Sequence, residues 1–178
     1  MTGKTIEGVV TDMDSSTLYY HFVKRNGKTK PKTLDLERVF SITDSSGKEV
    51  LVYEMDTAIG NYFTVDEMRY YIYGEQDAMN GYRANWTWYA GIPITAGMGF
   101  GLSNSVLVFA VPFVYLVGAS LPGYNIKAST ISHPNYARQP SYILGYERTA
   151  RTRRLFKALG AAVIGTTIGV IAGQSILN

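Results

Sequence analysis

The feature of this sequence that most limits its fold is a stretch of 43 residues, Ala84 to Ile126, that contains no Asp, Glu, Lys, Arg or His. A water-soluble domain rarely leaves so long a run uncharged, because its loops must contact water. The hydrocarbon core of a bilayer is about 30 Å thick, so a helix that crosses it needs about 20 apolar residues. The stretch therefore predicts about two crossings joined by a tight reversal.

A polar tripeptide, Ser-Asn-Ser at 103–105, divides this stretch. The segment before it is rich in glycine, and the segment after it is rich in Val, Leu and Phe. We therefore predict a transmembrane hairpin within residues 84–126, with spans at about 86–102 and 105–121.

A second arrangement of the same stretch is one long tilted helix over 100–121, with residues 86–99 lying along the membrane surface. Both arrangements place amphipathic aromatic rings at the membrane–water interface, where such rings are enriched. The predicted interface aromatics are Trp86, Trp88 and Tyr89.

A third apolar segment ends the chain, since residues 158–178 carry no charge and are long enough for one crossing. Glycines recur in it every four residues and share one helical face, where another helix can approach closely. Two glycines in the first segment have the same spacing. We predict about three glycine-rich transmembrane helices, and the predicted helix-packing positions are Gly97, Gly101, Gly165, Gly169 and Gly173.

Charge is distributed unevenly along the chain. Residues 1–83 hold 10 Lys and Arg against 13 Asp and Glu, whereas residues 127–157 hold 7 basic residues and 1 acidic residue. The net charge of +3 is no argument for nucleic acid, and we expect no nucleic-acid partner. A basic cluster directly before a span attracts anionic lipid head groups. The predicted head-group contacts are Arg148, Arg151, Arg153, Arg154 and Lys157.

Residues 1–57 predict a small antiparallel β-unit. Runs of β-branched and aromatic residues alternate with turn residues, and Asn26-Gly27 is a strong hairpin signal because both residues tolerate positive φ. About five short strands with tight turns indicate a small barrel or SH3-like roll. With the apolar segments, the chain is predicted to be an α+β membrane protein.

Two amphipathic helices flank the predicted hairpin. The first occupies residues 64–83 and opens with a capping box formed by Thr64 and Glu67. Residues 127–140, which contain two prolines, form a connector loop. A basic amphipathic helix at 141–157 then leads into the last span.

The sequence shows no catalytic or metal-binding motif. The chain has two His and no Cys, so a metal site would need carboxylates from distant segments. Asp66, Glu67, Glu75 and Asp77 are spaced along one helix, which is typical of a solvated face. The spans contain no ionisable residue, which argues against an ion-coupled transporter. We predict no enzyme, no cofactor, no metal and no small-molecule substrate.

Three short motifs carry a family resemblance: Tyr-Gly-Glu-Gln-Asp-Ala at 73–78, Gly-Tyr at 145–146 and Ala-Arg at 150–151, followed by the C-terminal glycines. On these the chain resembles small uncharacterised envelope proteins of the Bacteroidota. The resemblance implies a cleaved leader, an N-terminal unit in the periplasm and no activity. The positive-inside rule instead predicts that the side holding the basic segment is cytoplasmic. Both the inner and the outer membrane are compatible with these features.

Two functions fit these features. The first is a membrane-anchored scaffold or accessory subunit of a larger bacterial envelope complex, whose glycine faces, typical of a glycine zipper, pack against helices of partner subunits. The second is a homo-oligomeric channel or membrane-spanning ring built from the same faces. The expected partners are membrane lipids and other membrane or envelope proteins, including further copies of this chain.

Overall fold

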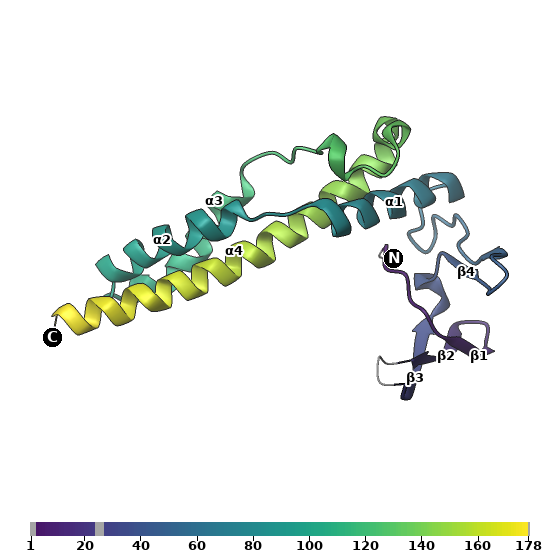
Figure 1. Cartoon of the computed structure of the whole chain (residues 1–178), viewed down its shortest axis with the longest axis horizontal. Helices are drawn as coiled ribbons and strands as arrows, with labels where there is room; N and C mark the ends of the chain where they lie inside the picture. Colours follow the sequence, from purple (N-terminus) through teal and green to yellow (C-terminus); the bar gives the residue numbers. More distant parts are fainter. Residues whose placement is uncertain (1–2, 24–26, 178) are drawn as a thin grey trace.

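The computed structural model of the chain describes residues 3–23 and 27–177. It is an elongated α+β molecule (Figure 1). The strands and helix α1 (Val65–Gly81) lie at one end, and helices α2 (Trp86–Gly101), α3 (Val111–Ser120) and most of α4 (Pro140–Leu177) form a bundle that reaches the C-terminus at the other.

Three strands form an antiparallel sheet in the order β1-β2-β3, with bounds Val9–Met13, Thr17–Val23 and Thr29–Asp35. Gly27 lies in the connection between β2 and β3 and has φ 75°, a positive value as the hairpin signal predicts for its glycine. Asn26 lies outside the described residues. Strands β4 (Ser41–Thr43) and β5 (Glu49–Leu51) form a separate two-stranded sheet.

The predicted barrel or roll is therefore wrong, since the strands described form two open sheets and no closed barrel. Strands β1 and β3 are free edges, and Pro31 removes one backbone donor from β3. Val9, Val10 and Met13 are exposed, so no second layer covers β1. A unit of this length is only marginally stable by itself, and the exposed apolar residues of β1 leave its sheet uncovered.

Helix α1 begins as predicted. The Glu67 backbone N–H donates to the Thr64 hydroxyl at 3.3 Å, and the Thr64 backbone N–H donates to the Glu67 carboxylate at 2.9 Å. This confirms the capping box. A small core of Tyr53, Met68 and Tyr71 joins α1 to the β-unit, and the Arg69 guanidinium pairs with Glu49 at 2.9 Å.

The stretch between residues 84 and 126 folds back on itself, so the arrangement as one long tilted helix is not observed. Helix α2 ends at Gly101, a turn follows, and the 3₁₀ segment Val106–Ala110 leads into α3. Pro112 stands at the start of α3, where its missing N–H costs nothing. Two more 3₁₀ turns, Ala128–Thr130 and Pro134–Arg138, lie in the connector before α4.

The final 38 residues before the C-terminus, Pro140–Leu177, form one continuous helix. The separate basic helix at 141–157 and terminal span at 158–178 are therefore two parts of α4. Tyr142, Tyr146 and Ala150 in its first half are buried together with Ala78 of α1. The second half packs against α2 and α3.

The prediction of about three spanning helices is also too high. Among the described residues, α4 is the one helix that is long and apolar enough to cross a membrane by length and composition. Helix α2 has 16 residues and α3 has 10, which correspond to about 24 Å and about 15 Å. Both are shorter than the hydrocarbon core of about 30 Å. Gly101 and the Ser-Asn-Ser tripeptide at 103–105 end α2 early.

Candidate functional site

The helical bundle is the candidate site, because its outer surface is apolar. Only 28% of the most apolar 18-residue window of α4 is buried inside the chain. A core helix of a water-soluble protein would be mostly buried. Large apolar side chains of all three bundle helices are exposed: Ile94, Phe100, Phe113, Val114, Val117, Val163, Ile164, Ile168 and Ile171.

Small residues hold α4 against α2. A Cβ atom added to Gly165 would lie 2.5 Å from the Ile92 carbonyl oxygen, and one on Gly173 would lie 2.6 Å from the Ser103 hydroxyl. A Cβ on Gly169 would meet the Ala96 carbonyl oxygen and lie 2.7 Å from the Phe100 nitrogen. The three C-terminal glycines therefore lie at a helix contact within this chain, where only a hydrogen atom fits.

The side of α2 that meets α4 is not the side singled out from the sequence. Gly97 and Gly101 have no described atom within 4 Å of an added Cβ, so they face away from the bundle. The contact uses a different four-residue series on α2, which was readable in the sequence: Thr87, Gly91, Thr95 and Gly99, all buried.

Arg154, predicted to contact lipid head groups, is instead buried, with 3% of its surface exposed. Its guanidinium donates to the Tyr82 hydroxyl at 3.0 Å, to the Gly123 carbonyl oxygen at 3.1 Å and to the Pro122 carbonyl oxygen. It also lies 4.0 Å from the ring centroid of Tyr124. This side chain therefore joins the segment that follows α3 to α4, and the head-group role does not apply to it.

The helical position of Arg154 explains its burial. It lies four residues after Ala150 and four before Ala158, and both alanines have no exposed surface. The sequence of the basic cluster alone did not separate it from Arg151, which is exposed. The four-residue series of small side chains on α4 is the signal that separates them.

The other basic residues divide between contacts within the chain and exposure. Arg148 donates to the Tyr71 hydroxyl at 2.8 Å, and Arg153 donates to the carbonyl oxygen of Tyr82 at 3.3 Å. The Lys157 ammonium donates to the Asn85 side chain at 2.9 Å. Arg148, Arg151 and Lys157 retain surface on the outside of the molecule.

The three predicted interface aromatics lie at the start of α2, close to the level of this basic cluster on α4. Trp86 and Tyr89 are exposed, and the Arg154 guanidinium carbon lies 5.9 Å from the Trp86 ring centroid. Trp88 is half-buried and lies beside Gly160. Aromatic rings and cations therefore lie at the same boundary between the polar end and the apolar end.

Two carboxylates of α1 that were assigned to a solvated face are buried. Glu75 is 4% exposed and accepts a hydrogen bond from the Gly3 N–H. Burial raises the pKa of Glu75 above its ordinary value, although the Gly3 N–H and the charge of Arg148 oppose the rise. The Glu75 carboxylate therefore joins the N-terminal segment to α1.

The second buried carboxylate, Asp77, binds the connector through Ser132. It accepts hydrogen bonds from the Ser132 N–H at 2.8 Å, from the Ser132 hydroxyl, and from the Tyr142 hydroxyl at 2.7 Å. These contacts join α1, the connector and α4. Glu75 and Asp77 both bind groups from distant segments of this chain, so they stabilise the fold.

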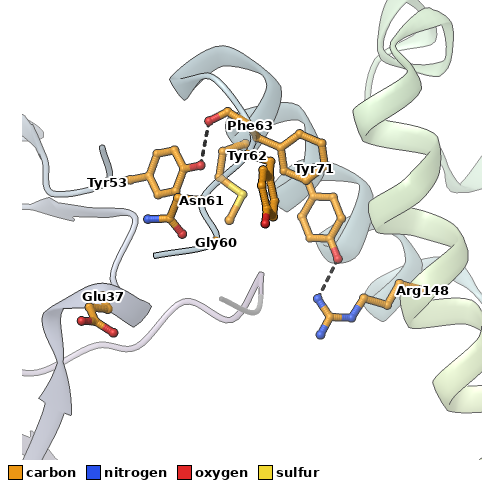
Figure 2. A pocket seen from close by; sticks show the side chains of 9 residues that line it. Glu37, Tyr53, Gly60, Asn61, Tyr62, Phe63, Tyr71 and Arg148 are labelled. Atoms are coloured by element: carbon orange, nitrogen blue, oxygen red, sulfur yellow. Dashed lines mark hydrogen bonds between the residues drawn. The ribbon is translucent and has the colours of Figure 1, made fainter. Parts of the chain in front are cut away.

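A cleft of about 250 Å³ lies where the β-unit meets the helices (Figure 2). Arg148 reaches into it from α4 toward the Tyr71 hydroxyl, and Glu37 lies on the opposite side. Aromatic rings of Tyr53, Tyr62 and Phe63 contribute the wall between them. The lining of the cleft combines one cation, one carboxylate and aromatic rings.

In residues 3–23 and 27–177, no three Asp, Glu or His side chains are grouped so that they could hold a metal ion. No protein-family model, curated protein or solved structure matches this chain. The contacts described above are therefore the basis for assigning it a role.

Proposed function

We propose that this chain is a non-enzymatic, membrane-anchored scaffold or accessory subunit of a bacterial envelope complex. The observation that carries the proposal is the apolar outer surface of the bundle. Exposed Val, Ile and Phe side chains cover α2, α3 and the second half of α4, and no Asp, Glu, Lys or Arg interrupts these segments. At about 25 cal/mol per Å² of apolar surface, transfer from water into hydrocarbon strongly favours insertion.

The dimensions of the bundle support insertion into one bilayer. Residues 158–177 of α4 are 20 residues long, so they extend about 30 Å, which matches the hydrocarbon core. The hairpin of α2 and α3 runs beside this part of α4 and reverses at Ser103, which contacts Gly173. We propose that α4 crosses the membrane and that the shorter hairpin inserts beside it from the same side as the β-unit.

The side on which the β-unit lies is part of the proposal. The β-unit, α1 and the connector lie together at one end of the bundle, and the C-terminus lies at the other (Figure 1). We propose that the polar end is periplasmic, as the family resemblance implies, whereas the positive-inside rule predicts the cytoplasm. Protease access to residues 28–32 in intact cells and in spheroplasts distinguishes the two sides.

The scaffold role rests on how the chain uses its own surfaces. Gly165, Gly169 and Gly173 are covered by α2, so this face is not available for a ring of copies. Gly97 and Gly101 are uncovered, and we propose that a helix of a partner subunit packs there. The open sheets and the cleft beside Arg148 offer surfaces to a partner outside the membrane.

Purification of the full chain from its native membranes in a mild detergent, followed by mass measurement, tests this function. A stoichiometric set of other envelope proteins supports the scaffold. A closed ring of this chain alone, with ion conductance in a planar bilayer, supports the homo-oligomeric channel instead. Gly97→Leu in the same preparation should release the partners, whereas Gly118→Leu, at another uncovered glycine on α3, is the control.

A further inference from the structure

The basic charge of the N-terminal part is concentrated in one hairpin. Residues 24–32 contain five Lys and Arg and no Asp or Glu, whereas the rest of residues 1–83 contains five basic and 13 acidic residues. Among the described members of this group, Lys30 and Lys32 are exposed on β3. An otherwise acidic unit therefore carries a single basic end.

The sheet register places these lysines together. Lys30 lies opposite Phe22 and Lys32 opposite Tyr20, so both project from the same face of β3. The Lys32 ammonium lies 5.2 Å from the ring centroid of Phe22. This cation–π contact places a cation and an apolar ring side by side on the sheet, a combination that suits a boundary between apolar and anionic groups.

Acidic side chains occupy the other end of the same sheet. Asp12 and Asp14 lie at the connection between β1 and β2, and Asp35 ends β3 opposite Thr17. In Figure 1 the connection between β1 and β2 is turned away from the side on which α2 and α3 lie. The acidic end of the sheet therefore faces away from the proposed membrane surface, and the start of β3, which carries Lys30, lies at the opposite end of the sheet.

We propose that the lysine-bearing end of the β2–β3 hairpin, with Lys30 and Lys32 as its contacts, binds the anionic head groups of the membrane that holds the bundle. The inference rests on the proposed membrane insertion and adds a second, electrostatic attachment that fixes the orientation of the β-unit. Each lysine at an anionic surface contributes a factor of about 5.4 to binding, so the two together contribute about thirtyfold.

The chain has no cysteine, so single labels can be introduced cleanly. Thr29→Cys places a nitroxide at the basic end, and Ser46→Cys places one in the exposed turn between β4 and β5. The full chain is reconstituted in vesicles that contain a nickel chelate on the lipid head group. Collision of each nitroxide with nickel is measured in vesicles rich in phosphatidylglycerol and in vesicles of phosphatidylcholine alone.

In anionic vesicles, the label at residue 29 should collide with nickel more often than the label at residue 46. In phosphatidylcholine vesicles, this difference should disappear. The double variant with Lys30→Gln and Lys32→Gln should lower the ratio of docked to undocked hairpin about thirtyfold. High salt should also lower this ratio, because it screens the attraction between the lysines and the head groups. The control Lys48→Gln, in the exposed strand connection of the second sheet, should leave the signal unchanged.

Equal collision of the two labels, or no dependence on lipid charge, overturns the inference. A response to soluble polyphosphate without any response to anionic vesicles also overturns it, because the hairpin then binds a soluble polyanion. Flotation of the same labelled vesicles separates this failure from failure of the proposed function. Protein that floats but shows no hairpin contact disproves only the hairpin, whereas protein that does not float disproves insertion itself.

Discussion

The contact between α2 and α4 makes a prediction in which one chemical change has opposite effects at two glycines. Gly169→Ala adds a methyl group where the Ala96 carbonyl oxygen and the Phe100 nitrogen already lie, the latter 2.7 Å from the new Cβ. Gly97→Ala adds the same group where no described atom lies within 4 Å. Both sites are interior positions of helices, so intrinsic helix propensity changes equally.

The magnitudes follow from these two environments. Overpacking costs about 1–3 kcal/mol, and backbone atoms on the facing helix place Gly169 at the upper end of that range. Replacing glycine by alanine in a helix contributes about 1 kcal/mol in the stabilising direction. Gly169→Ala should therefore destabilise the bundle by about 2 kcal/mol, and Gly97→Ala should stabilise it by up to about 1 kcal/mol.

Reversible unfolding of the purified chain in mixed micelles, with increasing sodium dodecyl sulfate and helicity as the signal, measures the difference. We expect about 3 kcal/mol between the two variants. Gly118→Ala, at an uncovered glycine on α3, is a second control that should follow Gly97→Ala. Equal effects at residues 97 and 169 would show that α2 and α4 do not meet through the C-terminal glycines.

Three further predictions concern the polar end of the molecule, all measured by unfolding in the same micelles. Because the pKa of Glu75 is raised, the folded chain binds the proton more tightly than the unfolded chain, so the free energy of unfolding should rise as the pH falls through the folded pKa. Glu75→Gln should therefore be more stable than the parent at neutral pH and equal to it in acid. A variant that is less stable than the parent at neutral pH would contradict this expectation. Asp77→Ala should lower the free energy of unfolding by about 2–4 kcal/mol, because it leaves the Ser132 N–H and the Tyr142 hydroxyl without their acceptor. The control Asp66→Ala, at the exposed start of α1, should lower it far less. Similar losses in the two variants would refute the role of Asp77. Arg154→Met should destabilise the chain by about 3 kcal/mol through loss of its hydrogen bonds to Tyr82 and to the segment that follows α3, while Arg151→Met should have little effect. The reverse order would show that Arg154 faces lipid.

The features that the sequence predicted correctly depend on local chemistry. The Thr64 and Glu67 capping box forms because both partners lie within one turn. The reversal near residues 103–105 occurs where polar residues interrupt an apolar run. The four-residue spacing of the C-terminal glycines predicts a close contact because spacing alone sets the helical face.

The features that the sequence did not predict depend on long-range contacts. Glu75 and Asp77 were assigned to solvent because their burial is caused by Gly3 and by the connector, which are distant in the chain. Gly97 and Gly99 are two residues apart on α2, and only the position of α4 decides which of the two is covered. The prediction of a closed barrel failed because the number of strands does not show whether enough apolar surface exists to cover both faces of the sheet.

The central claim, that the bundle lies in hydrocarbon, is tested most directly by flotation. The full chain is mixed with lipid in detergent, the detergent is removed, and the vesicles are centrifuged through a density gradient at alkaline pH, which removes proteins held only by charge. The chain should float with the lipid, and without lipid or detergent it should aggregate. A chain that stays at the bottom of the gradient as a monodisperse, folded species in plain buffer would contradict it.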